Sequence, residues 1–416
     1  MEIIVLDNGL LGRGEHSYQL LLEICKALAR RGIAYRVFGA KRMHRSLIAD
    51  IGAIAHFRGS LYEGKFPPFL EFVARIQALL RDFLSGKSIF SEERTWRVLN
   101  ETYEGDLGRL PADVWKRENL VVVPAISQNQ VYGLIRYLRS LSPRALPKVV
   151  CHLMFTPSWT PWGCNGRLGE SYYRSAFMLA GGLIDSSLFF TTENDALADV
   201  YRRQFKINTT ILPIALPIFR LPQTKAKKVR LGFFGYSKTE KGFHLLPEAI
   251  EFCRAKQLPV QFIVQIQHSN WEKKTIAAEK RLRRMPDVEL VDGTMSNAEY
   301  AEKTNSVDIT LLPYDPERFG PRGSGIFTAA VAAGRPIIAA QGIYAATSIE
   351  RGEAEGEIFA PYDAAALAAA IERLLPRLSA CRARAAERAA KFARRHSGDA
   401  YSDVLLSLFG QKSDAA

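Results

Sequence analysis

The sequence predicts an α/β protein made of two doubly wound domains with parallel sheets. In both halves of the chain, short apolar runs typical of buried strands alternate with segments of helical periodicity. Pro217–Lys228 (PIFRLPQTKAKK) separates the two series, and its prolines and basic run indicate a linker. The length of 416 residues suits two domains of ordinary size. We therefore place one domain at 1–216 and the other at 229–395.

Composition narrows the class of protein. The chain is 47% hydrophobic and 24% charged, which is ordinary for a globular domain, and no apolar run is long enough to span a membrane. The N-terminus enters a strand directly, without the features of a secretory signal. The five cysteines are scattered and include no C-x-x-C pair, which favours free thiols over a disulfide frame or a zinc site. These observations predict a cytoplasmic protein.

The net charge of +13 indicates anionic partners. Nucleic acid, an anionic membrane surface and phosphorylated small molecules all fit such a balance. The chain has no zinc-finger spacing and no basic repeat interleaved with aromatic residues, so we expect no nucleic-acid partner. Phe69–Leu84 has apolar residues at helical spacing, and two interpretations stay open: a helix that packs on its domain, or a basic helix that faces a membrane or an acceptor.

The N-terminal half opens as a strand, a turn and a helix. Glu2–Asp7 is a predicted strand, Gly9–Gly14 a glycine-rich turn, and about 15–31 an amphipathic helix. Glycines in the turn would let a phosphate approach the backbone, although the spacing does not match G-x-G-x-x-G. Further strands are predicted at 35–39, 119–127, 148–155, 186–192 and 209–215, and helices at 128–140, 170–179 and 194–205.

The C-terminal half repeats the alternation more regularly. Strands are predicted at 230–234, 260–267, 288–291, 308–313, 335–340 and 356–360. Helices are predicted at 243–256, 272–284, 297–305, 325–333 and 363–375, with one or more helices over 378–409.

One stretch of this half carries a candidate anion site. Asp308–Pro313 is a buried-strand pattern, a polar loop follows, and Ser324 is a predicted N-cap of a small-residue helix that Gly334 ends. The free amides and the dipole of such a helix favour an anion such as a phosphate. Arg322, two residues before the cap, adds a positive fork suited to phosphate. An ordinary β–α unit with a surface arginine is the alternative interpretation.

Five short segments resemble a known family. Gly232–Leu246 (GFFGYSKTEKGFHLL) is similar to "G-R-x-x-x-E-K-G-x-x-x-L", and 329–336 (AAVAAGRP) to "E-A-M-A-x-G-x-P". The stretch 350–375 is similar to "G-x-L-V-x-P-x-D-x-x-A-L-A". Gly12–His16 with the following helix, and the Thr192–Asn194 turn, match N-terminal motifs. The chain resembles the GT-B glycosyltransferases, specifically the large retaining group (family 4-like, "glycosyl transferases group 1").

The resemblance implies a fold and an activity. The two Rossmann-like domains would face a central cleft, with the nucleotide-sugar donor on the C-terminal domain and the acceptor on the N-terminal one. The last helix, about 396–416, would pack back on the N-terminal domain. The implied enzyme is a retaining hexosyltransferase that moves a hexose from a nucleotide diphosphate sugar to a saccharide or lipid-linked acceptor. Bacterial surface polysaccharide or lipopolysaccharide assembly is the implied setting, with a peripheral location at the inner face of the membrane.

A clamp on the leaving diphosphate is what this chemistry needs, because negative charge develops there as the glycosidic bond breaks. The "E-K-G" lysine, which contacts the diphosphate in the family, is Lys241 here. With cations in this role, we expect no metal ion and no other cofactor. The predicted donor-binding residues are Gly12, Gly14, Gly235, Lys241, Arg322, Gly323, Ser324, Gly325 and Ile326.

Two departures from the family pattern support a second hypothesis. The family's acidic pair falls on Pro321 and Ala329, and the arginine of its "G-R" turn is Tyr236 here. Arg322 is a candidate to replace that charge, and Glu317 or Asp315 is a candidate to replace one of the acids. The alternative is a catalytically degenerate GT-B protein that binds a nucleotide or glycan as a scaffold or regulator.

Histidines and tryptophans are the remaining candidates. His152 lies in a predicted strand that carries a histidine near the reacting sugar in the family, and it is either such a group or a satisfied core histidine. His16, beside the glycine turn, is the rival catalytic candidate. Trp159 and Trp162 either stack on an acceptor sugar or form a local packing plug. The chain shows no Ser-His-Asp order, metal-ligand cluster or P-loop, so hydrolase and kinase interpretations have no support.

Overall fold

The computed structural model describes residues 1–13, 16–59, 92–159, 166–217, 228–268 and 272–410. Gly14, Trp162, Phe69–Leu84 and most of the predicted linker Pro217–Lys228 lie outside the described residues. The chain divides into two compact units. Unit 1 comprises 1–215 with 398–416, and unit 2 comprises 216–397.

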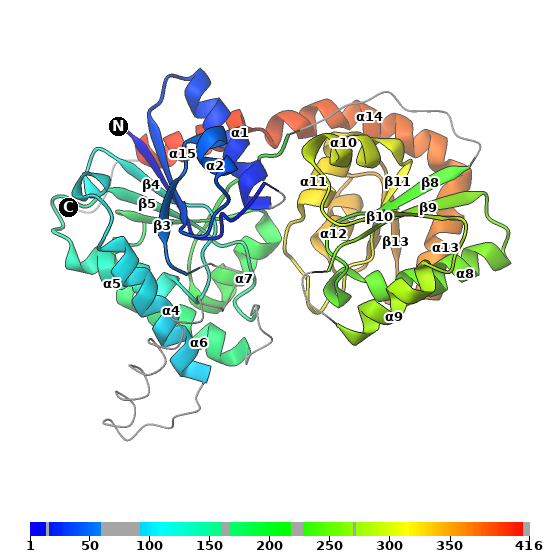
Figure 1. Ribbon diagram of the computed structural model, residues 1–416, viewed down its shortest axis with the longest axis horizontal. Coiled ribbons are helices and arrows are strands. Elements are labelled where there is room, and N and C mark those ends of the chain that lie inside the picture. The colour runs from blue at the N-terminus through cyan, green and yellow to red at the C-terminus, as the bar shows by residue number, and fades with distance from the viewer. Residues whose placement is uncertain (14–15, 60–91, 160–165, 218–227, 269–271, 411–416) are drawn as a thin grey trace. The chain divides into compact units, whose positions relative to one another are not determined.

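Unit 1 is built on a parallel sheet in the strand order β3-β2-β1-β4-β5-β6-β7 (Figure 1). Its strands are β1 (Ile3–Asp7), β2 (Tyr35–Ala40), β3 (Ile54–Phe57), β4 (Leu120–Val123), β5 (Lys148–His152), β6 (Leu188–Thr192) and β7 (Thr210–Ile211). Its α-helices are α1 (His16–Arg30), α2 (Ser46–Ile51), α4 (Glu92–Leu107), α5 (Val131–Ser140), α6 (Gly166–Ala180), α7 (Asp195–Phe205) and α15 (Gly398–Gly410).

Helices cover both faces of this sheet, which is why its strands are continuously apolar. Ile4 and Leu6 of β1 belong to one core with α4, α5, α6 and α7. Ile3 and Val5 point the other way, into a core with α1, α2 and α15. All five residues of β1 are buried, as expected for a strand buried on both faces.

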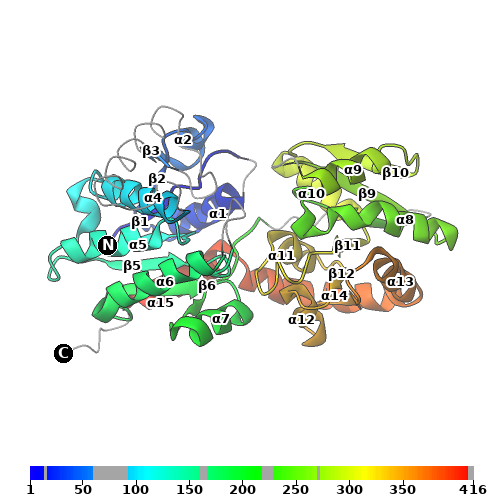
Figure 2. The ribbon, with the colours of Figure 1, turned by 90° about the horizontal axis from the view of Figure 1, so that it is seen from below.

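The last helix completes unit 1 (Figure 2). Tyr401, Leu405 and Leu408 of α15 are buried in the same core as α1. Gly398 lies so close to α1 that an added Cβ would stand 2.2 Å from the backbone oxygen of Glu23. The close approach of the two helices therefore requires a glycine there.

Unit 2 repeats the architecture with a parallel sheet in the order β10-β9-β8-β11-β12-β13. Its strands are β8 (Val229–Phe233), β9 (Val260–Ile266), β10 (Val288–Asp292), β11 (Ile309–Leu312), β12 (Ile337–Ala340) and β13 (Gly356–Phe359). Its α-helices are α8 (Leu246–Ala255), α9 (Lys273–Leu282), α10 (Asn297–Ser306), α11 (Gly325–Ala332), α12 (Tyr344–Glu350), α13 (Ala364–Leu374) and α14 (Leu378–Arg395).

This sheet is also buried on both faces. Figure 1 shows α8, α9 and α13 on one side of it and α10 and α11 on the other. Leu311 of β11 belongs to the core shared with α8, α9 and α13, whereas Leu312 packs in the core that contains Phe327 of α11. Two parallel, doubly wound sheets confirm the predicted fold class. Among the described residues, no helix combines the length and the apolarity needed to cross a membrane.

Some elements differ from the sequence expectation. The predicted strand at 209–215 shrinks to β7, and β12 starts at Ile337 rather than Arg335. Arg335 is instead buried and donates a hydrogen bond of 2.8 Å to the backbone oxygen of Asn305. The short α2 and the edge strand β3, whose Ile54 is exposed, lack a clear periodic signal. α4 is largely polar, and its buried apolar side chains among those described are Trp96, Leu99, Tyr103 and Leu107 at helical spacing.

Candidate functional site: an anion cradle in unit 2

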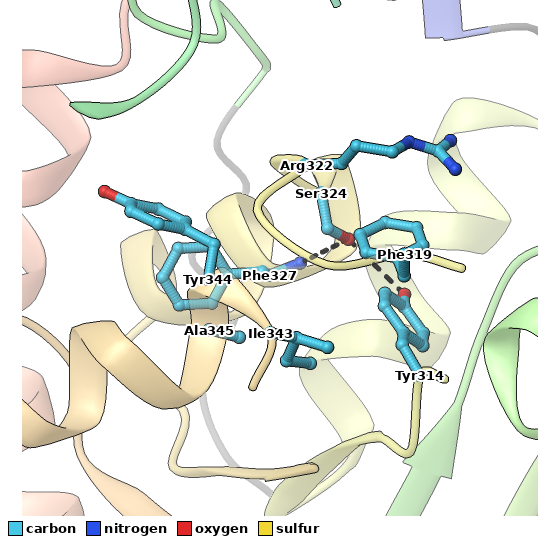
Figure 3. A pocket seen from close by; sticks show the side chains of 8 residues that line it. All are labelled: Tyr314, Phe319, Arg322, Ser324, Phe327, Ile343, Tyr344 and Ala345. Atoms are coloured by element: carbon cyan, nitrogen blue, oxygen red, sulfur yellow. Dashed lines mark hydrogen bonds between the residues drawn. The ribbon is translucent and has the colours of Figure 1, made fainter. Parts of the chain in front are cut away.

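The loop after β11 ends in a capped helix, as the sequence predicts. Ser324 is the N-cap of α11, and its Oγ accepts a hydrogen bond of 3.3 Å from the backbone N–H of Phe327. The Tyr314 hydroxyl is hydrogen-bonded to the same Oγ at 3.3 Å (Figure 3). The loop therefore begins and ends on one hydroxyl pair, which fixes where α11 starts.

Aromatic side chains pack against one another beneath the Arg322 side chain and support the loop between β11 and α11. The rings of Tyr314 and Phe319 lie 4.5 Å apart between centroids, and with Phe327 and Ile343 they line a hollow that is too narrow for a water molecule. Figure 3 shows the Arg322 side chain running outward, away from Phe327 and Tyr344. Its guanidinium carbon lies 4.5 Å from the centre of the Phe319 ring. The cluster is thus a packed support for Arg322 rather than a ligand cavity.

The turn after β8 docks directly on the end of β11. Gly242 has φ +71°, and a Cβ at this position would stand 1.7 Å from the backbone oxygen of Pro313. The backbone N–H of Asp315 donates a hydrogen bond of 2.9 Å to the oxygen of Glu240. Glycine is needed at 242 for both reasons, positive φ and close approach. The "E-K-G" turn and the Arg322 loop are therefore one rigid surface.

Lys241 is enclosed by this surface. Its Nζ lies 5.7 Å from the centre of the Tyr314 ring and would be 2.9 Å from a Cβ built on Gly235. Although the residue is partly exposed, burial lowers the pKa of the ammonium to about 8, with repulsion from Lys238 and Arg322 acting in the same direction. Within the part of the chain that the structure describes, no carboxylate forms an ion pair with Lys241.

The Gly235 turn is held by a buried amide. Gly235 has φ +91°, and its N–H donates a 2.8 Å hydrogen bond to Oε1 of Gln265. The amide nitrogen of Gln265 in turn donates to the Gly293 oxygen at 2.8 Å. Gln265 is 3% exposed. It ties together the ends of β8, β9 and β10, and so fixes the backbone beside Lys241.

The remaining predicted donor residues of unit 2 line the same place. Ile326 of α11 lies against Gly235, 3.8 Å from the Cβ that an alanine would have, and Gly325 is the first residue of α11. Gly323 precedes the cap. Structure thus brings Gly235, Lys241 and Arg322 together with the N-terminus of α11 at the carboxyl ends of β8 and β11. Two cations and free helix amides at one point favour a multiply charged anion.

The predicted residues of unit 1 gather less tightly. His152 ends β5, is buried, and its Nδ1 is hydrogen-bonded to the Thr191 hydroxyl at 3.0 Å. That contact is what a satisfied core histidine makes, yet it also fixes the ring at the carboxyl edge of the sheet. His16 is the first residue of α1. Gly12 has no neighbour within 4 Å of an added Cβ, so its surroundings leave room for a ligand without requiring glycine.

Trp159 agrees better with the packing alternative. Its ring stacks on Phe155 with centroids 3.8 Å apart and planes 8° apart, and Nε2 of Gln128 donates a hydrogen bond of 2.5 Å to its backbone oxygen. One face of the indole is therefore covered by protein.

The carboxyl edge of the unit 1 sheet, where His152 lies, also holds a buried carboxyl that was not among the predicted site residues. Asp7 ends β1 with 1% exposure. Its Oδ1 accepts from the N–H of Gly9 at 2.8 Å, and burial raises the pKa of the carboxyl to about 6. From the sequence, Asp7 is a weaker acid/base candidate whose favoured interpretation is a strand-end cap, because the extent to which its carboxyl is buried depends on helices distant in the chain.

The comparison with protein families decides what unit 2 is. Residues 228–377 match the family described as "Glycosyl transferases group 1". Unit 2 contains a group 1 glycosyltransferase domain. The match spans β8 to the start of the C-terminal helices, and so includes the whole cradle of Lys241 and Arg322. No curated protein matches the chain by sequence.

Solved structures extend the similarity to the whole chain. HepE from Anabaena, crystallised with UDP and glucose, matches with a TM-score of 0.63 at 15% identity, covering 99% of this chain and 100% of that one. A structure from Escherichia coli described as "Trehalose-6-phosphate … bound with UDP-2-fluoro glucose" matches with a TM-score of 0.64 at 13% identity, covering 99% of each chain. A glycosyltransferase from Rickettsia africae matches at 0.61 and 10% identity, also over 99% of each. The fold is GT-B.

Sequence reasoning missed two residues of the cradle. Glu240 lies beside Arg322 although 82 positions separate them, and Gln265 holds the Gly235 turn. In the sequence, Glu240 is visible only as part of the "E-K-G" motif, and Gln265 lies in an apolar strand. In the described ranges, no group of three or more His, Cys, Asp or Glu side chains is arranged so that it could hold a metal ion. Independence of the reaction from metal stays a prediction.

Proposed function

We propose that the protein is a glycosyltransferase that moves a hexose from a nucleotide diphosphate sugar to a saccharide or lipid-linked acceptor. The observation that carries the proposal is that two positively charged side chains, Lys241 and Arg322, lie near each other beside the capped N-terminus of α11. Both lie inside the segment that matches the group 1 family. Similar folds crystallised with UDP or a UDP sugar support the donor class. Retention of configuration is proposed from the family resemblance.

In this proposal, the donor diphosphate lies against the cradle. Lys241 and Arg322 neutralise the charge that grows on the leaving diphosphate, and the amides of Gly323, Ser324 and Gly325 donate to its oxygens. Gly12 and Gly14 let a loop of unit 1 approach the donor, and His152 or His16 serves the reacting sugar or the acceptor. No metal ion takes part, because the two cations fill that role.

Binding is the direct test. UDP, GDP and ADP, each with its common sugars, would be tested by thermal shift against the native protein, Lys241→Ala and Arg322→Ala. A ligand present at one hundred times its dissociation constant adds about 2.7 kcal/mol to stability. The proposal expects one diphosphate to raise the melting temperature of the native protein, and the rise to be much smaller in each variant. Arg373→Ala, which removes an exposed arginine paired with Glu357 elsewhere in unit 2, is the control that keeps the response.

A binding protein without turnover is the second candidate, and a specific observation favours it. Pro321 and Ala329 stand where the family carries its acidic pair. Transfer of a labelled hexose to water or to an acceptor, measured with the diphosphate sugar that binds, separates the two. Stable binding with no product after long incubation would favour the scaffold.

A cytoplasmic setting with peripheral association at an anionic membrane, in bacterial surface polysaccharide or lipopolysaccharide assembly, completes the proposal. The net charge of +13 supports it. Flotation with vesicles containing anionic lipid should recover the protein at low salt, and high salt should release it. Absence from the vesicle fraction at low salt would contradict this part alone.

A further inference from the structure

Glu240 occupies an unusual place in the cradle, because it is an acid beside groups proposed to hold an anion. Its Oε2 lies 3.4 Å from Nη1 of Arg322, and its Oε1 lies 3.8 Å from Nζ of Lys238. The side chains of Arg322 and Glu240 are only 12% and 19% exposed. A partly buried contact of this kind is screened less by salt than a surface ion pair.

The same arginine is held on a second side. Its guanidinium lies over the Phe319 ring at 4.5 Å, and Phe319 packs on Tyr314. Glu240 itself is fixed by the hydrogen bond from Asp315 to its backbone oxygen. The planar guanidinium of Arg322 therefore lies between the Phe319 ring and the Glu240 carboxylate, and both of these residues are held by contacts with the rest of unit 2.

Holding the fork matters for binding. A free arginine side chain loses conformational freedom when it grips a ligand, and an arginine that is already oriented loses less. The guanidinium has five N–H donors, and the contact with Glu240 engages Nη1.

We propose that Glu240 is a positioning residue, which holds the Arg322 guanidinium in the orientation that receives the donor diphosphate. This inference rests on the proposed function. It assigns to the glutamate of the "E-K-G" turn a role in this chain that depends on Arg322, a residue of a different loop.

Two possible roles of Glu240 predict opposite changes in diphosphate affinity when its charge is removed. A carboxylate that merely neutralises the cradle would repel a diphosphate, so that its removal would tighten binding. A carboxylate that orients Arg322 supports binding, so that its removal weakens it. Glutamine keeps the size of the side chain and removes the charge, which makes Glu240→Gln the informative change.

Isothermal titration with UDP, or with GDP or ADP where that diphosphate binds instead, would measure Glu240→Gln, Arg322→Ala and the double variant. We expect Glu240→Gln to weaken binding about fivefold to tenfold in the native background and to have no weakening effect once Arg322 is alanine. Unchanged or tighter binding by Glu240→Gln would overturn the proposal. Equal weakening with and without Arg322 would overturn it too, because the effect would then not pass through Arg322.

Glu289→Gln is the matched control. Glu289 also lies between an arginine and a lysine, 3.2 Å from Arg230 and 2.6 Å from Lys303, but near the amino ends of β8 and β10. It should leave the affinity for the diphosphate unchanged. If Glu240→Gln does not fold, Glu240→Asp, which keeps the charge on a shorter side chain, replaces it, with the same expected weakening and the same dependence on Arg322.

The two levels of the argument fail differently. If the native protein binds none of the three diphosphates, the proposed function fails and this inference fails with it. If the native protein binds one and Glu240→Gln binds it equally well, only the role of Glu240 is wrong.

Discussion

Replacing Lys241 with methionine should stabilise the protein while it abolishes the response to the diphosphate. Methionine keeps the length and apolar stem of lysine and removes the charge. Burial and the neighbouring cations lower the pKa of the ammonium from 10.5 to about 8, which means that the folded protein disfavours the charged form. Each unit of such a shift corresponds to about 1.4 kcal/mol. At pH 7.5 the charged lysine therefore costs on the order of 3 kcal/mol, an upper value because Lys241 is partly exposed.

Urea unfolding followed by circular dichroism, with and without UDP, measures both effects. Lys241→Met should raise the free energy of unfolding without ligand by up to about 3 kcal/mol, and UDP should add nothing further. The unfolded chain binds more protons than the folded one between pH 8 and 10.5, so the native protein should gain stability as pH rises through that window. The variant should lack this rise.

Lys238→Met is the matched comparison. Lys238 is a neighbour in the same turn whose Nζ lies 3.8 Å from Glu240, and its replacement should change stability by no more than about 0.5 kcal/mol. A Lys241→Met variant that is less stable than the native protein would refute the claim that the charge is held at a cost. A Lys241→Met variant that is more stable and still responds to UDP would refute the role of Lys241 in binding the diphosphate.

Three further predictions follow from the same geometry. Diphosphate affinity should fall about tenfold between pH 7 and pH 9 as Lys241 loses its proton, measured by calorimetry in matched buffers; a flat profile would contradict this. Gly242→Ala should cost more than about 3 kcal/mol in urea unfolding, because its Cβ meets the Pro313 oxygen, whereas Gly293→Ala, with φ +79° but nothing within 4 Å, should cost only about 1–2 kcal/mol; similar costs would contradict the docking argument. Asp7→Asn should stabilise on the order of 3 kcal/mol at pH 8, because the folded pKa of about 6 exceeds the unfolded value of 3.8, and the gain should shrink as the pH falls through 6 and vanish below about pH 4; a gain that does not change with pH would mean that packing, and not the charge of Asp7, causes it.

The parts that could be predicted from the sequence are those with a local cause. Ser324 caps α11 because a small hydroxyl residue before an apolar run suits the first free amides. Asn194 and Asp363 cap α7 and α13 for the same reason. Parallel strands buried on both faces read as continuous apolar runs, and the two sheets followed from them. Their bounds depend on partner strands, which is why the expected strand at 209–215 contains only Thr210–Ile211.

Contacts between distant segments could not be predicted in this way. Lys241 and Arg322 were chosen from two separate motifs, but their meeting depends on Gly242 fitting against Pro313. Glu240 acquires its place only when β8 and β11 pair. The buried state of Asp7 arises from helices that pack on both faces of β1, one of them from the far end of the chain. Contacts of this kind between residues far apart in the chain leave no local pattern in a single sequence.

The return of α15 to unit 1 has a consequence for biosynthesis. Unit 2 is one uninterrupted stretch, 216–397, whereas unit 1 is discontinuous and includes 398–416. During synthesis, unit 2 has all its residues before the ribosome has made Tyr401, Leu405 and Leu408, which fill the α1 face of unit 1. The N-terminal part of unit 1 is thus translated before unit 2, yet its hydrophobic core is completed after all of unit 2 has been made. Until then, the α1 face stays uncovered, and a nascent chain that stalls near residue 397 would present it to chaperones and proteases.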